Sequence, residues 1–87
     1  MIEPIRVLYF AWLRERVGVA QEEIPLPEGV ATVTALVDHL SAIDARHEAA
    51  FRDRKAVRCA VNQEFADPGS AVRPGDEVGF FPPVTGG

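Results

Sequence analysis

One amphipathic helix, set among short strand-like segments, constrains the fold of this chain most strongly. Apolar residues recur every three or four positions, at Val33, Leu36, Val37, Leu40 and Ile43. This spacing places them in one stripe along a helix of about three turns, and Thr32 is suited to cap its N-terminus. A helix with a single apolar stripe must bury that stripe against another layer. We therefore predict that the helix packs on one face of a sheet.

Five short segments are predicted to supply the strands of that sheet. Residues 5–10 are rich in β-branched and aromatic side chains, which favour strands. Alternation places Ile5, Val7 and Tyr9 on one face of this strand and Leu8 and Phe10 on the other. The other predicted strands are residues 21–26, 57–62, 64–66 and 76–81, with inward-facing side chains at Ile24, Leu26, Val57, Cys59 and Val61.

Two short helical segments complete the pattern. Residues 11–17 are predicted to form a helix that ends at Gly18, and residues 45–55 a short helix and loop. One main helix among a run of strands is typical of an α+β domain with that helix on one face of the sheet. If the last strand lies at the centre of the sheet, the C-terminal residues leave the domain from a rigid base.

Length and charge exclude several functional classes. Eighty-seven residues form one small domain, and a net charge of −4 argues against nucleic acid as the main partner. No apolar stretch approaches the ~20 residues that would cross a membrane, and the N-terminus lacks the pattern of a signal peptide. One cysteine cannot form an intramolecular disulfide. We expect a cytoplasmic protein that binds neither membrane nor nucleic acid.

Motifs for catalysis or metal binding are lacking. Residues 47–51 resemble half of a zinc motif, but Phe51 stands where a second histidine would be needed, so no metal site is expected. His39 and His47 are expected to be solvated or half-buried. Cys59 could be a sulfur-carrying nucleophile, but its alternation with Val57 and Val61 favours a buried, structural thiol.

The C-terminal residues 80–87 carry no charged side chain. Pro82 and Pro83 stiffen this segment, and Gly86 and Gly87 lack the Cβ atom that would keep them out of a narrow slot. We expect a domain of residues 1–81 followed by an extended tail of residues 82–87, whose terminal carboxylate is presented to another protein. The alternative is a frayed end or a cloning scar.

Two aromatic residues are predicted to lie near the base of this tail. Phe10 and Phe81 both fall, by alternation, on the sheet face opposite the helix. Together they would form an exposed apolar patch, which usually marks a binding site for a partner. The alternative is that a loop covers them.

Residues 76–87 read Asp-Glu-Val-Gly-Phe-Phe-Pro-Pro-Val-Thr-Gly-Gly. This segment resembles the C-terminus of the small subunit of molybdopterin synthase, a family whose members end in a near-identical sequence. Residues 7–11, 14–15, 32–33 and 60–63 add to the resemblance, which covers essentially the whole chain. Trp12 and Cys59 depart from the family pattern without touching the tail. The resemblance implies a ubiquitin-like β-grasp fold, with a mixed sheet of about five strands.

The family resemblance also implies the function of a sulfur carrier. In the family, an E1-like adenylyltransferase uses ATP to adenylate the C-terminal carboxylate, here that of Gly87, and a sulfur donor converts it to a thiocarboxylate. The tail then inserts into the large synthase subunit, where sulfur passes to cyclic pyranopterin monophosphate. The implied tail-insertion residues are Pro82, Pro83, Val84, Thr85 and Gly86, and the implied docking residues are Phe10, Phe65 and Phe81, with Arg14 at the rim.

The implied assembly is a heterotetramer of two small and two large subunits. The small subunit would not be catalytic alone and would hold no permanent cofactor. Three alternatives remain from the sequence. A sulfur carrier of the thiamine pathway would share the fold and the chemistry but not the Phe-Phe-Pro-Pro-Val segment. A ubiquitin-like protein modifier would share the adenylation and differ in the acceptor, and a plain adaptor domain would use only the apolar patch.

Overall fold

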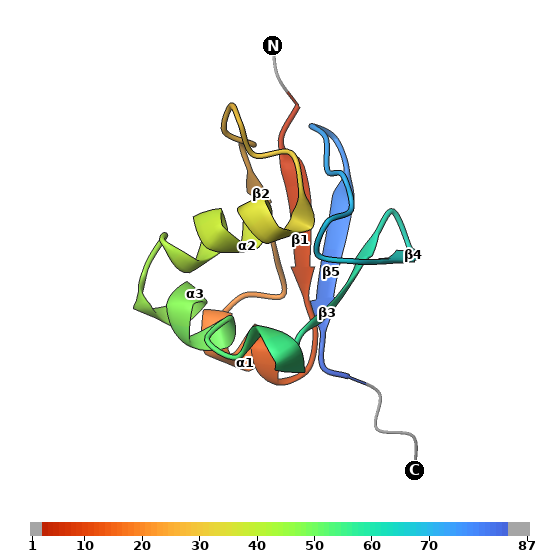
Figure 1. Ribbon diagram of the computed structural model, residues 1–87. Helices are drawn as coiled ribbons and strands as arrows, with labels where there is room; N and C mark the ends of the chain where they lie inside the picture. Colours follow the sequence, from red (N-terminus) through yellow and green to blue (C-terminus); the bar gives the residue numbers. More distant parts are fainter. Residues whose placement is uncertain (1–2, 84–87) are drawn as a thin grey trace.

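The computed structural model describes residues 3–83, which fold into a five-stranded sheet with helices packed on one face (Figure 1). The strands are β1 (Ile5–Tyr9), β2 (Gln21–Ile24), β3 (Arg58–Val61), β4 (Glu64–Ala66) and β5 (Glu77–Phe81). The helices are α1 (Trp12–Val17), α2 (Val33–Ser41) and α3 (Ala45–Ala50), followed by a 3-10 turn, η1 (Arg54–Ala56). The predicted α+β class is confirmed.

The order of the strands in the sheet is β2-β1-β5-β3-β4, so the last strand lies at the centre. β5 pairs with β1 in parallel and with β3 antiparallel, which makes the sheet mixed. Parallel strands end at the same edge of a sheet. The chain therefore leaves β5 at the edge where β1 ends and α1 begins (Figure 1).

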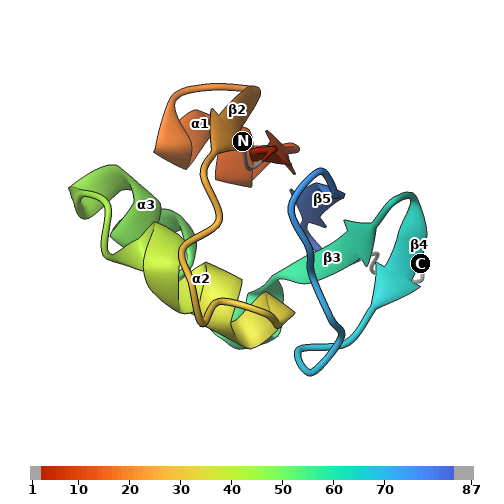
Figure 2. The same cartoon turned by 90° about the horizontal axis from the view of Figure 1, so that it is seen from above.

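The core lies between the sheet and α2, with α3 beside it (Figure 2). Alternate side chains of the two central strands point into it and are almost fully buried, namely Val7, Tyr9, Val78 and Phe80. From the helical layer, the ring of Phe51 packs edge-on against that of Phe80, with 4.9 Å between the ring centroids. The predicted cap of α2 is confirmed, because the Thr32 hydroxyl accepts a hydrogen bond from the Ala35 amide at 3.2 Å.

The helical stripe and the second strand are shorter than predicted. α2 ends at Ser41, so Ile43 lies beyond it and is 43% exposed, although the other four residues of the predicted stripe are buried. β2 ends at Ile24, and Leu26 is only partly buried. Pro25 has no N–H to donate to a neighbouring strand, which explains why the strand stops before it.

The described residues show neither a membrane-crossing helix nor a metal cluster. Within residues 3–83, the helices lack the length and apolarity that a bilayer span requires. In the same range, three or more histidine, cysteine or acidic side chains do not gather closely enough to hold a metal ion.

Candidate functional site

The face of the sheet that the helices leave uncovered has small residues at its centre. Strand register places Gly79 of β5 between Leu8 of β1 and Ala60 of β3. Leu8 and Ala60 are only partly buried. Because Gly79 and Ala60 are small, they leave part of this face low, and larger side chains beside them can rise above it and contact a partner.

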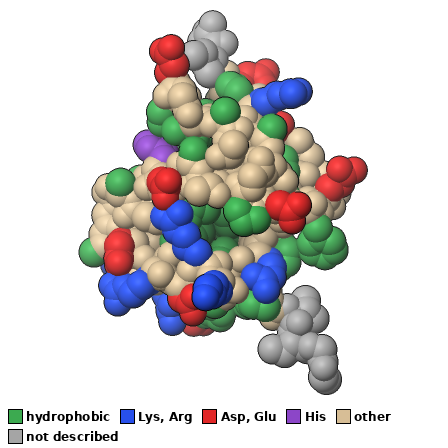
Figure 3. All heavy atoms as spheres, in the orientation of Figure 1, with side chains coloured by type: hydrophobic (Ala, Val, Ile, Leu, Met, Phe, Trp, Pro, Cys, Tyr) green, Lys and Arg blue, Asp and Glu red, His purple; other side chains and the backbone are tan. Residues whose placement is uncertain are grey.

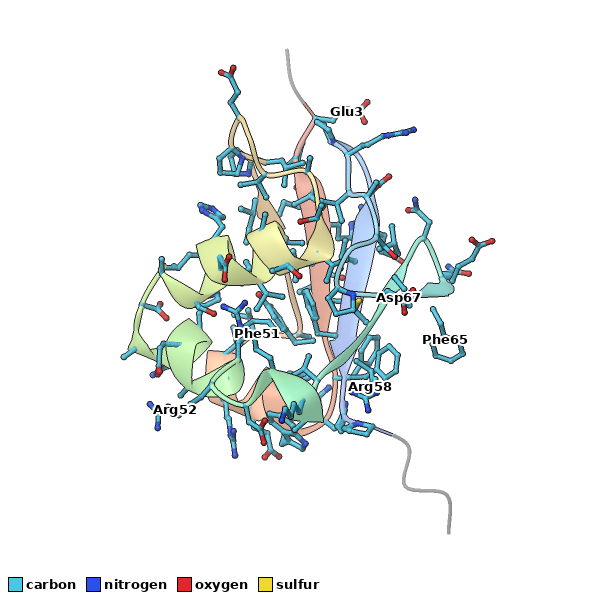
Figure 4. The ribbon with its side chains drawn as sticks, viewed as in Figure 1. Glu3, Phe51, Arg52, Arg58, Phe65 and Asp67 are labelled. Carbon is cyan, nitrogen blue, oxygen red and sulfur yellow. The ribbon has the colours of Figure 1, made fainter. Side chains whose placement is uncertain are left out.

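Phe65 is the most exposed large hydrophobic residue of the described chain, and Phe81, which is partly buried, lies beside it on this face. Their rings lie 5.9 Å apart, centroid to centroid, at an angle of 57°. Phe65 is 88% exposed and projects from β4 away from the body of the molecule (Figure 4). An aromatic ring exposed to this extent gains from covering by a partner because its apolar surface is otherwise in water.

Phe10 directly follows β1 and lies beside β5. Its amide donates a hydrogen bond to the Phe80 carbonyl at 3.1 Å, which extends the pairing of β1 with β5 by one residue. A Cβ atom on Gly79 would lie 3.3 Å from Phe10 Cε2, so the phenyl ring rests close to the glycine. Phe10 is 49% exposed, so no loop within residues 3–83 buries it as the alternative from the sequence would require. We call Phe10, Phe65 and Phe81 the aromatic patch.

The β3–β4 hairpin that carries Phe65 is fixed by Asn62, whose role the sequence analysis missed. Asn62 and Gln63 both have positive φ, 51° and 70°, as a type I′ hairpin turn requires. The Asn62 side chain donates to Asp76 Oδ1 at 3.1 Å and accepts from the Glu77 amide at 3.0 Å. The predicted strand 57–62 wrongly included Asn62, since β3 ends at Val61; an asparagine in a two-residue connection between strand-like segments is the signal that indicates such a turn.

Arg14 and the start of the tail lie at the sheet edge where β1 and β5 end. Arg14 is exposed on α1, and within residues 3–83 it forms no ion pair. Pro82 and Pro83 directly follow β5 and are partly buried. The remaining predicted tail residues, Val84, Thr85, Gly86 and Gly87, lie outside the described residues.

A buried histidine links the helical layer to the sheet on the other side of the molecule. His47 is only 5% exposed, which shows that the expectation of a solvated or half-buried side chain was wrong. Its Nδ1 lies 2.8 Å from Asp44 Oδ1, and its Nε2 lies 2.7 Å from Glu22 Oε2. The Tyr9 hydroxyl donates to the same Glu22 oxygen at 2.8 Å. The histidine therefore joins α3 to β2 and β1.

The pKa values in this cluster favour an imidazolium between two carboxylates. Burial acts to lower the pKa of His47, but its hydrogen bonds to Asp44 and Glu22 and their charges outweigh burial, so the pKa is raised. The pKa of Asp44 is lowered, first by the hydrogen bond from the His47 amide and then by the imidazole. Burial and the hydrogen bond to Glu22 raise the pKa of the Tyr9 hydroxyl.

We predict that His47 makes the stability of the domain fall with rising pH. Because its pKa is raised on folding, its contribution is complete below the unfolded pKa of about 6.5 and is lost as pH rises through the folded pKa. His47→Gln should therefore cost about 2 kcal/mol near pH 6 and less at alkaline pH. Urea unfolding at a series of pH values measures this. His39→Gln, which removes the other histidine, should leave the profile unchanged, and an equal effect of both variants would contradict the prediction.

Cys59 is buried beside β4, as the sequence predicted. It is 8% exposed, and its thiol donates a long hydrogen bond to the Ala66 carbonyl at 3.6 Å. Burial, with the charge of Asp67, raises the pKa of this thiol. A raised pKa disfavours the thiolate, which is the nucleophilic form. The structure therefore indicates a packing role for this cysteine.

We predict that Cys59→Ser leaves unchanged the sulfur loading of the C-terminus that the family resemblance implies. The substitution changes one buried atom and should cost about 1 kcal/mol of stability without touching the tail. Intact-mass analysis after sulfur loading measures the outcome. If a folded Cys59→Ser variant no longer gained sulfur, Cys59 would have a role in sulfur loading and the prediction would be wrong.

Comparisons with known proteins agree over nearly the full length of the chain. The model of the ThiS family matches residues 7–87. The chain is 43% identical over 83 residues to the molybdopterin synthase sulfur carrier subunit of Escherichia coli K12, an alignment that covers 95% of this chain and 99% of that protein. The match to the ThiS family thus includes the residues from Val84 onward that the structure leaves undescribed.

Solved structures show the same fold. One, described as a molybdopterin converting factor subunit 1 from Pyrococcus furiosus, matches with a TM-score of 0.75 at 37% identity, covering 94% of this chain and 99% of that chain. The small archaeal modifier protein 1 of Haloferax volcanii matches with a TM-score of 0.72 at 28% identity, covering 94% and 99%. The ubiquitin-like β-grasp fold that the resemblance implied is confirmed.

Proposed function

This chain belongs to the ThiS family and to the molybdopterin synthase sulfur carrier subunits, and on that premise we propose that it carries sulfur as a thiocarboxylate on Gly87. The proposal takes the carboxylate of Gly87 as the reacting group and assigns no chemistry to the folded body. The domain serves to hold the tail and to bind the partners that load and unload it.

Two steps would place sulfur on the tail. A free carboxylate resists substitution because its leaving group would be oxide. An E1-like adenylyltransferase overcomes this by joining the carboxylate of Gly87 to the α-phosphate of ATP, with release of pyrophosphate. A sulfide equivalent from the donor then attacks the acyl carbon, and AMP leaves with the oxygen. The product is the thiocarboxylate.

The observation that carries the proposal is the position of β5. The central strand of the sheet ends at Phe81, whose ring contacts Phe65 in the aromatic patch. The tail therefore starts at the docking surface that we propose, from the most constrained strand of the domain. A partner that covers the patch would receive the first tail residue at a fixed position, which reduces the freedom lost when the tail enters its site.

The composition of the tail suits entry into a narrow, buried channel. Six residues from Pro82 to Gly87 reach about 20 Å when extended. Pro82 and Pro83 limit the conformations of the free chain, so less entropy is lost on insertion. The absence of charged side chains avoids the cost of removing such groups from water.

In this proposal the large subunit of molybdopterin synthase is the acceptor partner. The aromatic patch, with Arg14 at its rim, docks on the large subunit, and the tail delivers sulfur to cyclic pyranopterin monophosphate there. Two such transfers supply the two sulfur atoms of the dithiolene, and the assembly is a heterotetramer of two small and two large subunits. The small subunit holds no permanent cofactor, and ATP belongs to the E1-like partner.

The direct test is intact-mass analysis of the full chain. After incubation with the E1-like partner, ATP and a sulfur source, the mass should rise by the difference between one sulfur and one oxygen atom. The reaction without ATP is the control. A mass that never changes under these conditions would contradict the proposal.

We predict that Gly86→Val separates binding from transfer. The β-branched side chain widens the tail next to its last residue and restricts its backbone, whereas the aromatic patch is untouched. Sulfur transfer within the synthase should fall at least about 100-fold, while the affinity for the large subunit changes by less than about tenfold. Calorimetry and single-turnover transfer measure the two quantities. If sulfur transfer and affinity fell by the same factor, the tail rather than the aromatic patch would supply most of the binding free energy, and the prediction would be wrong.

A role as a protein modifier is the second candidate. It is favoured by the structural likeness to the small archaeal modifier protein 1. Both functions begin with adenylation of Gly87 and differ in the acceptor, which is an amine for a modifier. Incubation of the adenylated chain with lysine-bearing proteins should then give conjugates on a denaturing gel. Under the proposed function, sulfur loading occurs and such conjugates do not form.

A further inference from the structure

A pocket lies on the helical side of the sheet, away from the aromatic patch. α2 packs over the central strands, and the space between α2, η1 and the β3–β4 hairpin is left open as a pocket of about 430 Å³. Figure 3 shows this hollow with hydrophobic side chains at its base and both basic and acidic side chains around it. Phe51, Arg58 and Asp67, labelled in Figure 4, belong to three of the segments that line it.

The floor of the pocket is apolar. It is formed by core side chains, among them Val33, Val37, Phe51 and Cys59, each less than 9% exposed. Val57 and Ala66 complete it. An apolar group placed here would lose contact with water on most of its surface, and the floor would need no rearrangement to receive it.

The mouth of the pocket carries an excess of positive charge, although the chain as a whole has a net charge of −4. Arg54 is neutralised by Asp38, whose Oδ1 lies 2.6 Å from its Nη2. Lys55 and Arg58 form no ion pair with any carboxylate of residues 3–83.

Two further features bear on that charge. Arg58 is paired with Phe81, so its side chain leaves β3 on the patch face, and its Nη1 donates to the Lys55 carbonyl in η1 at 2.9 Å. Asp67 is the one acidic residue among the described residues that line the pocket. The pocket is therefore lined by two cations without an ion pair in residues 3–83 and by one acid.

We propose that this pocket binds a small organic anion with an apolar body, such as an aromatic carboxylate. The body fills the floor, and the carboxylate lies at the mouth near Lys55 and Arg58. The volume falls in the range of about 300 to 1,000 Å³ that is usual for small-molecule sites. The floor of the pocket and the aromatic patch lie on opposite faces of the sheet, and Arg58, the register partner of Phe81, lies between them. A ligand on the floor therefore does not cover the patch, and the proposal does not depend on the sulfur carrier function.

The test is a titration of the full chain, labelled with nitrogen-15, with 1-naphthoate. Saturable shifts are expected at the amides of Val57, Cys59 and Ala66. Uncharged 1-naphthalenemethanol should bind at least about fivefold more weakly because it lacks the anion. The proposal is overturned if the two probes bind equally, if the shifts centre on Phe65 and Phe81, or if no saturable shift occurs.

Matched variants separate the mouth from the floor. Lys55→Glu should weaken naphthoate binding at least about fivefold, whereas Arg73→Glu, which changes net charge equally outside this pocket, should alter it by less than about twofold. Ala66→Leu occupies part of the pocket and should weaken both probes, with amide dispersion reporting that the variant is folded. Equal effects of Lys55→Glu and Arg73→Glu would show that only net charge matters and would overturn the site.

Discussion

Deletion of Gly87 is expected to abolish sulfur loading completely while leaving the domain folded. The deletion removes the proposed reacting carboxylate and presents that of Gly86, one residue short of the partner's active site. Displacement of a reacting group by much less than one residue already costs orders of magnitude in rate. Residues 3–83 hold all of the described core, so Tm should change by less than about 2 °C.

Mass analysis after loading and a thermal melt measure the two outcomes on the same sample. Thr85→Ser is a matched control, since it changes the tail slightly and keeps both glycines; it should load normally. If the shortened chain melted well below the parent chain, the tail would be part of the folded domain, and the boundary at residue 81 would be wrong. If it loaded sulfur at the parent rate, Gly87 would not be the reacting residue.

Replacement of Phe81 by aspartate is expected to weaken the complex with the large subunit about 100-fold, which corresponds to about 3 kcal/mol. Phe81 lies between the central strand and the tail, and its ring contacts that of Phe65. A carboxylate there would be desolvated by the partner without a compensating group. Calorimetry with the isolated large subunit measures the change.

Phe65→Asp keeps this prediction testable if Phe81→Asp is poorly folded. Phe65 is 88% exposed, so its replacement should hardly affect folding and should still weaken the complex at least about tenfold. Ile43→Asp is the matched control, because Ile43 is also an exposed apolar residue, in the segment between α2 and α3. Equal affinities for the Phe65 and Ile43 variants would remove the aromatic patch from the interface.

The sequence by itself determined the elements and several of their ends. Alternating residues in β1 and the stripe in α2 were recognisable because side-chain periodicity is a local property of the backbone. The caps at Thr32 and Gly18 were predictable for the same reason, since a cap interacts with the nearest turn of its own helix. The proposed chemistry of the tail likewise comes from consecutive residues and from their resemblance to a family.

Tertiary structure decided what depends on residues far apart in the chain. His47 is buried because Glu22, 25 residues away, meets its imidazole, and Phe65 contacts Phe81 because β3 pairs with both of their strands. The pocket beside Lys55 is lined by residues from α2, η1, β3 and the end of β4, which lie far apart in the chain. Local propensity contains no information about such pairings, since their free energy comes from surfaces that meet only once the chain has folded.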